Sequence, residues 1–312
     1  MVYRKSVIIH KMKKLRKKLR KKLRKKLRKV FIMKIQRCSE LSPQIIYDTF
    51  MDGFQDYPIK IPMTEEQFLG HFFGPEGNSL EHSFLAMDGE KGVGLILGGI
   101  RELGGIKSMR CGTLCITPSL RGTGVANQLL SAHQTEAKDQ GCKQLCLEVL
   151  AQNERAIRFY QKNGYQSCYE LSYYSLGELT KKSDINLSDY EITEIPVTAL
   201  KEFRNAECKG LYINWQNEYA SIEKREALHL GVKRDQTLLG GMSVRNGNIQ
   251  FLFVTKDHRG KGLGTELLER AFATGQAGIH ISFSNNAMLT LFCHAVGMKK
   301  DDVYQYEMFR LI

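Results

Sequence analysis

Two glycine-rich stretches have the clearest potential for chemistry. Residues 121–126 read RGTGVA and residues 259–264 read RGKGLG, and each stands between a strand-like stretch and a helix-like stretch. Backbone N–H groups at the start of a helix lack intrahelical partners, and the helix dipole adds partial positive charge there. Such a turn can bind phosphate, and glycine lets the phosphate approach closely. A single loop of this kind is explained equally well as a tight connection between a strand and a helix. The residues around each loop must therefore decide whether it binds phosphate.

Two other phosphate-binding motifs are excluded by individual residues. A Walker loop needs G-x4-G-K-[ST], and the sequence does not contain it. The dinucleotide motif G-x-G-x-x-G fails because Asn127 and Thr265 occupy the positions of the third glycine. Each loop also follows an antiparallel-looking meander instead of opening a βαβ unit. The loops therefore predict a phosphate site of another kind.

Each loop is followed by a second similar stretch, so the chain contains an internal repeat. SLRGTGVANQLL at 119–130 recurs as DHRGKGLGTELL at 257–268, an offset of 138 residues. NERAIRFYQKNGY at 153–165 has its counterpart in NNAMLTLFCHAVGM at 285–298. The sequence therefore predicts two similar units in tandem.

The two stretches of each unit together resemble the GNAT family of N-acetyltransferases. The family motif R/Q-x-x-G-x-G/A is matched by Arg121, Gly124 and Ala126, and again by Arg259, Gly262 and Gly264. The second family element, an Asn followed by A-x-x-F-Y-x-x-x-G-[FY], is matched by Asn153, Ala156, Phe159, Tyr160, Gly164 and Tyr165. The resemblance covers most of the chain from Met33, with both motifs in the right order.

This resemblance implies a splayed sheet with acetyl-CoA as co-substrate and no metal. Acetyl-CoA would enter between strands at 107–116 and 144–150, with its pyrophosphate on the loop amides. Exposed backbone groups of one strand would pair with the pantetheine arm and polarise the thioester carbonyl. The cofactor-binding residues that follow are Leu114, Ile116, Arg121, Gly122, Thr123, Gly124, Val125, Ala126 and Asn153 in the first unit, and Arg259, Gly260, Lys261, Gly262, Leu263 and Gly264 in the second.

Acetyl transfer to an amine needs a neutral amine and a proton for the departing thiolate. A thiol has a pKa of about 8.5 and a phenol about 10, so a tyrosine keeps its proton near neutral pH and can donate it. Tyr160 is the expected acid; the alternative is an aromatic side chain that only packs beside Phe159. Glu148 is the candidate base, since it faces away from Leu147 and Val149 and could reach the cleft, although a solvated strand carboxylate is the preferred interpretation.

The second unit departs from the family pattern at the tyrosine. Aligning Gly297 with Gly164 places Cys293 at the position of Tyr160, and Asn286 matches Asn153. A buried, inert cysteine is the simpler interpretation of Cys293. We expect the second unit to be catalytically weak or silent, to hold CoA through its intact loop, or to complete a substrate cleft between the units.

Hydrophobic periodicity places the motifs on definite elements of an α/β fold with a mixed sheet. The first unit reads β-α-α-β-β-β-α-β-α-β. Its expected elements are strands at 34–38, 82–87, 92–103, 107–116, 144–150 and 165–174, and helices at 43–55, 64–72, 124–140 and 153–162. The second unit repeats strands at 248–254 and 279–283 and helices at 262–273 and from 285. We expect domains at 33–176 and 190–312, joined by a polar linker at 177–189.

The net charge of +13 belongs to an N-terminal arm. Residues 1–32 carry 16 Lys or Arg and no acid, and four Leu at every fourth position of the repeat. The remainder has 30 basic against 33 acidic residues, which argues against nucleic-acid binding by the globular part. We expect the arm to be disordered, with Met33 a possible start in the cell; contact with an anionic surface is the alternative.

Cysteine usage and hydropathy suggest a cytoplasmic protein without a transmembrane segment. The eight cysteines have none of the close spacing of a disulfide scaffold. The pairs Cys111/Cys115 and Cys142/Cys146 each lie four residues apart on expected strands, so adjacent strands could gather all four on one face, although small core residues are the simpler interpretation.

The acetyl acceptor that we expect is a small-molecule or peptide amine. A noncatalytic acetyl-CoA sensor is the alternative function.

Overall fold

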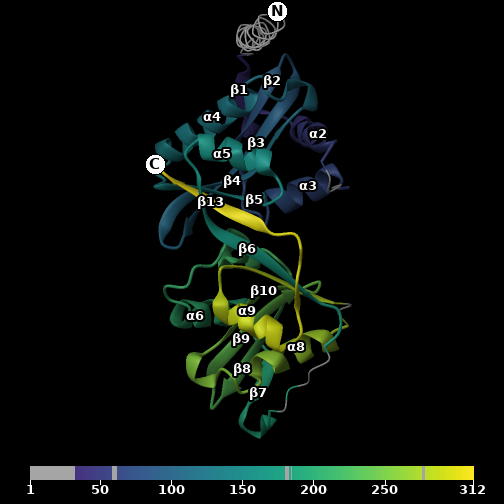
Figure 1. Cartoon of the computed structure of the whole chain (residues 1–312), viewed down its shortest axis with the longest axis vertical. Helices are drawn as coiled ribbons and strands as arrows, with labels where there is room; N and C mark the ends of the chain where they lie inside the picture. Colours follow the sequence, from purple (N-terminus) through teal and green to yellow (C-terminus); the bar gives the residue numbers. More distant parts are fainter. Residues whose placement is uncertain (1–31, 58–61, 180–182, 184, 276–277) are drawn as a thin grey trace, which may run out of the picture.

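The computed structural model describes residues 32–57, 62–179, 183, 185–275 and 278–312, which form an elongated molecule with two halves (Figure 1). We call the chain segment 33–176 unit one and the segment 190–312 unit two. Residues 1–31 of the basic arm lie outside the described residues, so its disorder stays a prediction. In the described part, no helix has both the length and the apolar character needed to cross a bilayer.

Unit one has the order of strands and helices that the sequence predicts. Its elements are β1 (Lys34–Arg37), α2 (Pro43–Phe54), α3 (Glu65–Phe72), β2 (Ser79–Asp88), β3 (Lys91–Leu103), β4 (Ile106–Ile116), α4 (Val125–Asp139), β5 (Gln144–Leu150), α5 (Glu154–Lys162) and β6 (Gln166–Leu176). Strands β1 to β4 form an antiparallel meander. The expected mixed α/β fold is therefore confirmed.

Side-chain caps start two of these helices where the sequence changes period. Thr64 accepts a hydrogen bond from the Gln67 N–H, and Gln67 accepts one from the Thr64 N–H, a capping box that begins α3. The Asn153 side chain accepts from the Ala156 N–H at 3.2 Å and begins α5. Helix α4 buries Val125, Leu129 and Leu130 against the sheet. Local sequence thus fixes the elements that carry both motifs.

Unit two repeats the plan of unit one. Its elements are β7 (Glu191–Glu194), α6 (Val197–Glu207), α7 (Tyr219–Ile222), β8 (Leu228–Arg234), β9 (Thr237–Arg245), β10 (Asn248–Val254), α8 (Leu263–Ala273), β11 (Ile279–Ser284), α9 (Ala287–Ala295), β12 (Lys299–Lys300) and β13 (Gln305–Leu311). The strand expected at 248–254 is confirmed to the residue. The helix expected from 285 begins at Ala287, after its N-cap Asn286.

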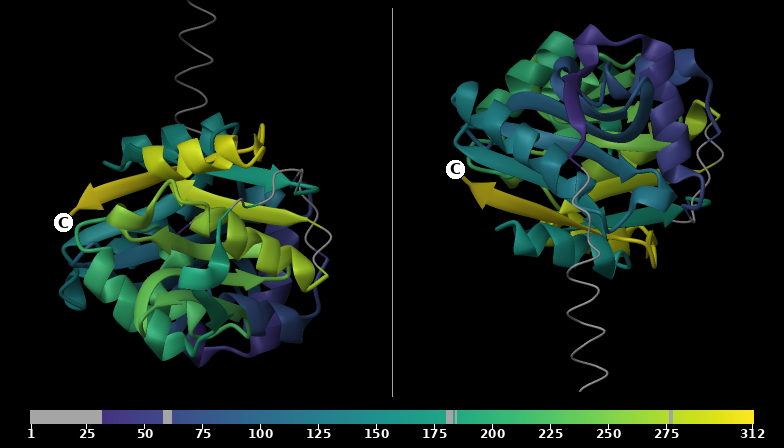
Figure 2. Two further views of the ribbon diagram at one scale, coloured as in Figure 1. Left: turned by 90° about the horizontal axis from the view of Figure 1, so that it is seen from below. Right: turned by 90° about the horizontal axis from the view of Figure 1, so that it is seen from above.

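The two units exchange their last strands. Strand β13 of unit two pairs with β5 of unit one, from Gln305↔Leu150 to Leu311↔Gln144. Strand β6 of unit one pairs with β11 of unit two, and β6 and β13 pair with each other. One continuous sheet results, in the order β1-β2-β3-β4-β5-β13-β6-β11-β10-β9-β8-β7. The yellow C-terminal strand beside the teal and blue strands of unit one marks the exchange (Figures 1 and 2).

The exchange has a consequence for how the chain divides into domains. Each half of the sheet is completed by a strand from the other unit, so separating the units would expose the edges of β5 and β11. The boundaries at 176 and 190 describe the sequence repeat, and independently folding domains with these boundaries stay a prediction. The hydrophobic core under α4 and α5 contains Met308, a residue of β13.

Candidate functional site

Strands β4 and β5 part from each other in the middle of unit one. They pair in parallel only at Ser108↔Gln144, Met109↔Leu145 and Arg110↔Cys146. Next to this point β4 bulges, because Gly98 pairs with Cys111 and Leu97 with Thr113, which leaves Gly112 without a partner on β3. Beyond the last pair the facing edges of both strands are open. This is the splayed arrangement that the sequence resemblance implies.

The open edge of β4 presents backbone groups of Leu114 and Ile116. The Thr117 N–H donates to the Val93 carbonyl of β3 at 3.0 Å. Along an antiparallel strand, residues whose backbone groups bond to the partner strand alternate with residues whose groups point away from it. The backbone N–H and C=O groups of Ile116 and Leu114 therefore point away from β3. The Ile116 carbonyl accepts instead from Arg121 Nε at 3.0 Å. The geometry places both residues where the sequence analysis expects them, and their contact with a cofactor stays a prediction.

The loop between β4 and α4 is open on its outer side. Gly122 and Gly124 have φ of +81° and +102°, which a residue with a side chain rarely adopts. A Cβ atom on either glycine would meet no heavy atom within 4 Å. The first N–H groups of α4, starting at Val125, lack partners within the helix. Free donors beside open space form a suitable cradle for phosphate.

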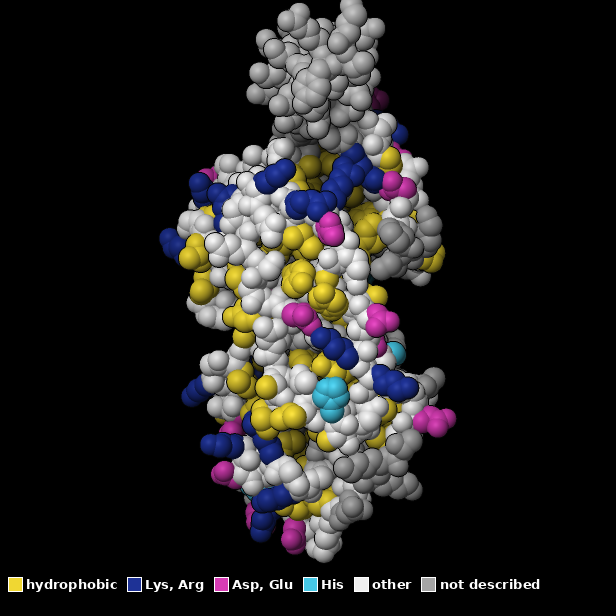
Figure 3. All heavy atoms as spheres, viewed as in Figure 1, with side chains coloured by type: hydrophobic (Ala, Val, Ile, Leu, Met, Phe, Trp, Pro, Cys, Tyr) yellow, Lys and Arg dark blue, Asp and Glu magenta, His cyan; other side chains and the backbone are white. Residues whose placement is uncertain are grey.

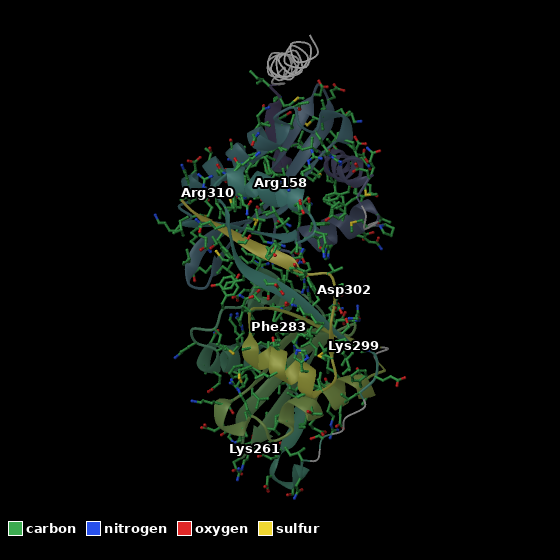
Figure 4. All side chains as sticks on the ribbon, in the orientation of Figure 1. Arg158, Lys261, Phe283, Lys299, Asp302 and Arg310 are labelled. Carbon is green, nitrogen blue, oxygen red and sulfur yellow. The ribbon has the colours of Figure 1, made fainter. Side chains whose placement is uncertain are left out.

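The Arg121 side chain binds other residues of unit one, which is not the position that ligand binding would suggest. Its guanidinium makes two hydrogen bonds to Asp56, at 2.6 and 2.7 Å, and donates to the Gly53 carbonyl at 2.9 Å. Arg121 therefore anchors the loop to α2. Other cationic side chains gather on the surface between α5 and α2 (Figure 3), and Arg158 of α5 is one of the basic residues on this side (Figure 4).

The Tyr160 hydroxyl lies at the apex of the splay. Tyr160 shares a buried core with Cys111, the first residue of β4 after the last pair with β5, and the two side chains interact. Burial raises the pKa of Tyr160 well above its ordinary value, and the nearby Cys111 and Tyr165 raise it further. The hydroxyl is therefore protonated throughout the neutral range and available as a donor.

Glu148 belongs to a buried ionic cluster. Its Oε2 accepts from Arg110 Nε at 2.7 Å, and Arg110 also reaches Glu76 Oε2 at 3.1 Å. The Arg110 and Glu148 side chains are each 5% exposed. Trp215 of unit two covers Arg110, with its ring centroid 5.6 Å from the guanidinium, and donates to the Glu76 carbonyl at 2.8 Å. The interpretation of Glu148 as a solvated strand carboxylate is therefore wrong.

Sequence reasoning missed Glu307, which the strand exchange brings to this cluster. Glu307 of β13 pairs in register with Glu148 of β5 and is 2% exposed. Its carboxylate accepts from the Tyr212 hydroxyl at 2.7 Å and from the Ser284 hydroxyl. Burial, assisted by the nearby Glu148, raises the pKa of Glu307 to about 7. An acid between the hydrophobic residues Tyr306 and Met308 was the available signal, but the residues that surround it in the structure are remote in sequence.

Unit two has the same splay with a different interior. Strands β10 and β11 pair only at Asn248↔His280 and Ile249↔Ile281. The bulge recurs at the equivalent position, where Gln250 replaces Gly112, and Arg259 Nε donates to the Val254 carbonyl at 2.9 Å as Arg121 does to Ile116. The internal repeat thus extends to the irregular features of the sheet.

The loop of unit two is open at Gly260, as unit one is at Gly122, but it is covered at Gly262, the counterpart of Gly124. A Cβ atom on Gly262 would lie 2.8 Å from Ser183 Oγ of the linker, and one on Gly264 would lie 2.8 Å from the Phe292 ring. Cys293, at the position of Tyr160, is fully buried, and burial raises its pKa to about 12.

The contacts of Asn153 and the positions of the cysteines differ from those expected from the sequence. The Asn153 side-chain oxygen is engaged as a helix cap, as is that of Asn286 in unit two. The bulge at Gly112 places Cys111 in the core under α4 and α5 and Cys115 in the core under α2 and α3, so the four cysteines do not gather on one face. Within the described residues, all eight cysteines are free and no group of His, Cys, Asp or Glu is arranged to hold a metal.

Comparison with known proteins agrees with this geometry. A family described as "Acetyltransferase (GNAT) domain" matches residues 79–167, and one described as "Acetyltransferase (GNAT) family" matches residues 190–292. Together these matches span more than half of the chain. The splayed sheet and glycine loops define an acyl-CoA-type acyltransferase fold. The chain belongs to the GNAT family and carries two GNAT units in tandem.

Solved structures show the same fold at low sequence identity. A tandem GNAT protein from the clavulanic acid biosynthesis pathway is 15% identical, with a TM-score of 0.65 over 89% of this chain and 98% of that one. A GCN5-related N-acetyltransferase from Sphaerobacter thermophilus is 12% identical, with a TM-score of 0.61 over 89% and 95%. A putative acetyltransferase from Pyrococcus horikoshii is 15% identical, with a TM-score of 0.59 over 90% and 89%. No curated protein sequence matches.

Proposed function

We propose that the protein is an acetyl-CoA-dependent N-acetyltransferase whose chemistry takes place in unit one. The observation that carries this proposal is the buried Tyr160 side chain beside Cys111, at the point where β4 and β5 part. An acid thus stands where the edges of the two strands open. A small-molecule or peptide amine would attack the acetyl group directly, in a ternary complex.

The residues of unit one fit acetyl-CoA. The open space over Gly122 and Gly124 and the free N–H groups of α4 suit a pyrophosphate, and the outward groups of Leu114 and Ile116 suit the pantetheine amides. Acetyl-CoA would supply an activated acyl group. The residues of unit two fit it less well, because Ser183 lies against Gly262 in the second loop. We therefore place one acetyl-CoA site in each chain.

The proposed reaction exchanges one bond for another. A C–N bond forms between the amine and the acetyl carbon, the C–S bond breaks, and the electron pair of that bond leaves on sulfur. Tyr160 donates a hydrogen bond and then its proton to the departing thiolate. The proton lost by the amine goes to Glu148, directly or through water, once the ion pair with Arg110 opens. The Leu114 and Ile116 strand edge polarises the carbonyl.

A matched pair of tyrosines tests the role of Tyr160. Tyr160→Phe removes the hydroxyl at the apex, whereas Tyr165→Phe removes a buried hydroxyl without a partner, from a ring 5.6 Å away. General acid catalysis contributes roughly 10² to 10⁴ in rate, so CoA release should fall by about that factor in the first variant and by less than about threefold in the second. Equal activity of the two variants would remove Tyr160 from the mechanism.

A noncatalytic acetyl-CoA-binding protein is the second candidate function. It is favoured by the burial of the Arg110–Glu148 pair under Trp215, since a closed acceptor side suits binding without transfer. A screen of primary amines for CoA release separates the two candidates. Saturable acetyl-CoA binding with no release for any amine supports the sensor. Eight free cysteines support a reducing compartment, and we propose a cytoplasmic location.

A further inference from the structure

One face of α5 carries three cationic side chains. Arg155, Arg158 and Lys162 stand at positions i, i+3 and i+7, so they lie on the same side of the helix, and all three are exposed. Arg158 bonds to Glu154 at 2.7 Å, and within the described residues neither Arg155 nor Lys162 forms an ion pair. The face therefore holds positive charge that the fold does not neutralise.

This cationic face belongs to a helix that lies against the phosphate cradle of unit one. The side chain of Asn163, the C-cap of α5, donates to the side chain of Asn127 in the first turn of α4, at 3.5 Å. Phe159 of α5 and Ala126 of α4 pack on the same hydrophobic core. The basic side chains around Arg158 are visible on the surface between α5 and α2 (Figures 3 and 4).

The cradle itself offers backbone donors but no free cation. Arg121 is the one basic residue of the loop, and its guanidinium is bound to Asp56 by two hydrogen bonds. The first turn of α4 reads VANQ and contains no charged side chain. CoA carries a 3′-phosphate on the ribose beyond its pyrophosphate, and such a phosphate monoester has about two negative charges near pH 7. Its partners must come from outside the loop.

Unit two provides an internal comparison for the three cations. With Asn286 aligned to Asn153, their counterparts on α9 are Met288, Leu291 and Ala295. Met288 and Leu291 are 53% and 63% exposed, so this face is also open to solvent and differs in its charge. Unit two is also the unit in which Ser183 covers the loop at Gly262. The cationic face thus accompanies the open cradle and is missing beside the covered one.

We propose that Arg155, Arg158 and Lys162 bind the 3′-phosphate of acetyl-CoA, so that unit one selects acetyl-CoA over its 3′-dephospho form. A guanidinium can donate to two phosphate oxygens at once, and the lysine adds a third positive charge. Arg158 would exchange Glu154 for the phosphate at little cost, because both side chains of that ion pair are exposed. The proposal rests on the proposed function, which places acetyl-CoA in unit one.

Calorimetric titration of the full chain with acetyl-CoA and with acetyl-3′-dephospho-CoA tests this assignment. The variant combines Arg155→Met, Arg158→Leu and Lys162→Ala, which are the residues of unit two at these positions. Lys138→Ala is the control, since Lys138 is an exposed lysine in the last turn of α4, away from the cradle. All the substitutions are at exposed positions, so each protein should fold.

The natural protein and the Lys138→Ala control should bind acetyl-CoA about tenfold or more tightly than the dephospho form. In the triple variant the two dissociation constants should agree within about twofold, with the loss confined to acetyl-CoA. Equal affinities in the natural protein, or an unchanged preference in the triple variant, would overturn the proposal. An equal loss for both ligands would also overturn it, because the cations would then act on the pyrophosphate.

The outcomes also separate this proposal from the proposed function. A preference for acetyl-CoA that the triple variant loses, in a chain that releases CoA with no amine, would refute the proposed function and support the phosphate site. CoA release with an amine, together with equal affinities for the two ligands, would have the opposite meaning. Failure of both ligands to bind would refute both proposals.

Discussion

Replacing Glu307 by Gln should make the stability of the protein less dependent on pH. Folding raises the pKa of Glu307 from 4.5 to about 7, through burial and the neighbouring Glu148. Between these values the folded state keeps a proton that the unfolded state has released. The free energy of unfolding of the natural protein therefore carries a contribution that falls as pH rises, by up to about 1.4 kcal/mol per pH unit.

From pH 5 to pH 8 this contribution sums to about 2.5 kcal/mol. Gln cannot ionise, and its amide can still bond to the hydroxyls of Tyr212 and Ser284. Urea unfolding of both proteins at several pH values gives the difference between their free energies of unfolding. That difference should rise by about 2 to 3 kcal/mol in favour of the variant from pH 5 to pH 8. Titrating groups that do not interact with Glu307 cancel in this difference.

Glu154→Gln is the matched control for this comparison. Glu154 lies on α5, with a side chain that is 75% exposed. Because its side chain is exposed, its replacement controls for the loss of one acidic residue and should have a far smaller effect than Glu307→Gln. If the Glu307→Gln difference is independent of pH, Glu307 is ionised in the folded protein, and the argument that burial and Glu148 keep it neutral is refuted.

Three further predictions concern single side chains. His133→Leu should raise the melting temperature, because both ring nitrogens of this buried residue lack partners and burial lowers its pKa to about 3 from 6.5. The natural protein should also lose more stability than this variant as pH falls from 6.5 toward 3, as urea unfolding at each pH would show. Gly124→Ala should abolish acetyl-CoA binding in calorimetry, whereas Gly89→Ala, at another open position with positive φ, should cost about 1 kcal/mol of stability and leave binding unchanged. Arg110→Met should cost about 3 to 5 kcal/mol in urea unfolding, because it leaves the buried Glu148 without its cation and Glu76 with Arg225 in place of two arginines; a loss below about 1 kcal/mol would contradict the described cluster.

The local features of the fold could be predicted from the sequence. Glycines, helix caps and hydrophobic period lie within a few residues of the elements they define, so β5 and β10 were predicted to the residue. The repeat also placed the parted strands correctly, because the Arg121 and Arg259 loops must follow the end of the strand. The exposed amides of the loops could also be predicted, because every strand-to-helix turn leaves the first N–H groups of the helix without intrahelical partners.

The features that depend on distant pairing could not be predicted. The bulge at Gly112 reverses the face of every later residue on β4, so the expected common face of Cys111 and Cys115 was wrong. Glu307 and Trp215 reach unit one only through the strand exchange and the contact between units. Nothing in the sequence near either residue indicates β5 or Glu76, because those contacts are set by the register of the whole sheet.

Calorimetric titration of the full chain with acetyl-CoA tests whether unit one alone binds the co-substrate. Unit one has an open loop beside parted strands, and unit two has a crowded loop beside a nearly filled cleft. We therefore expect saturable binding of one acetyl-CoA per chain. No binding at millimolar concentration, or binding of two per chain, would contradict it.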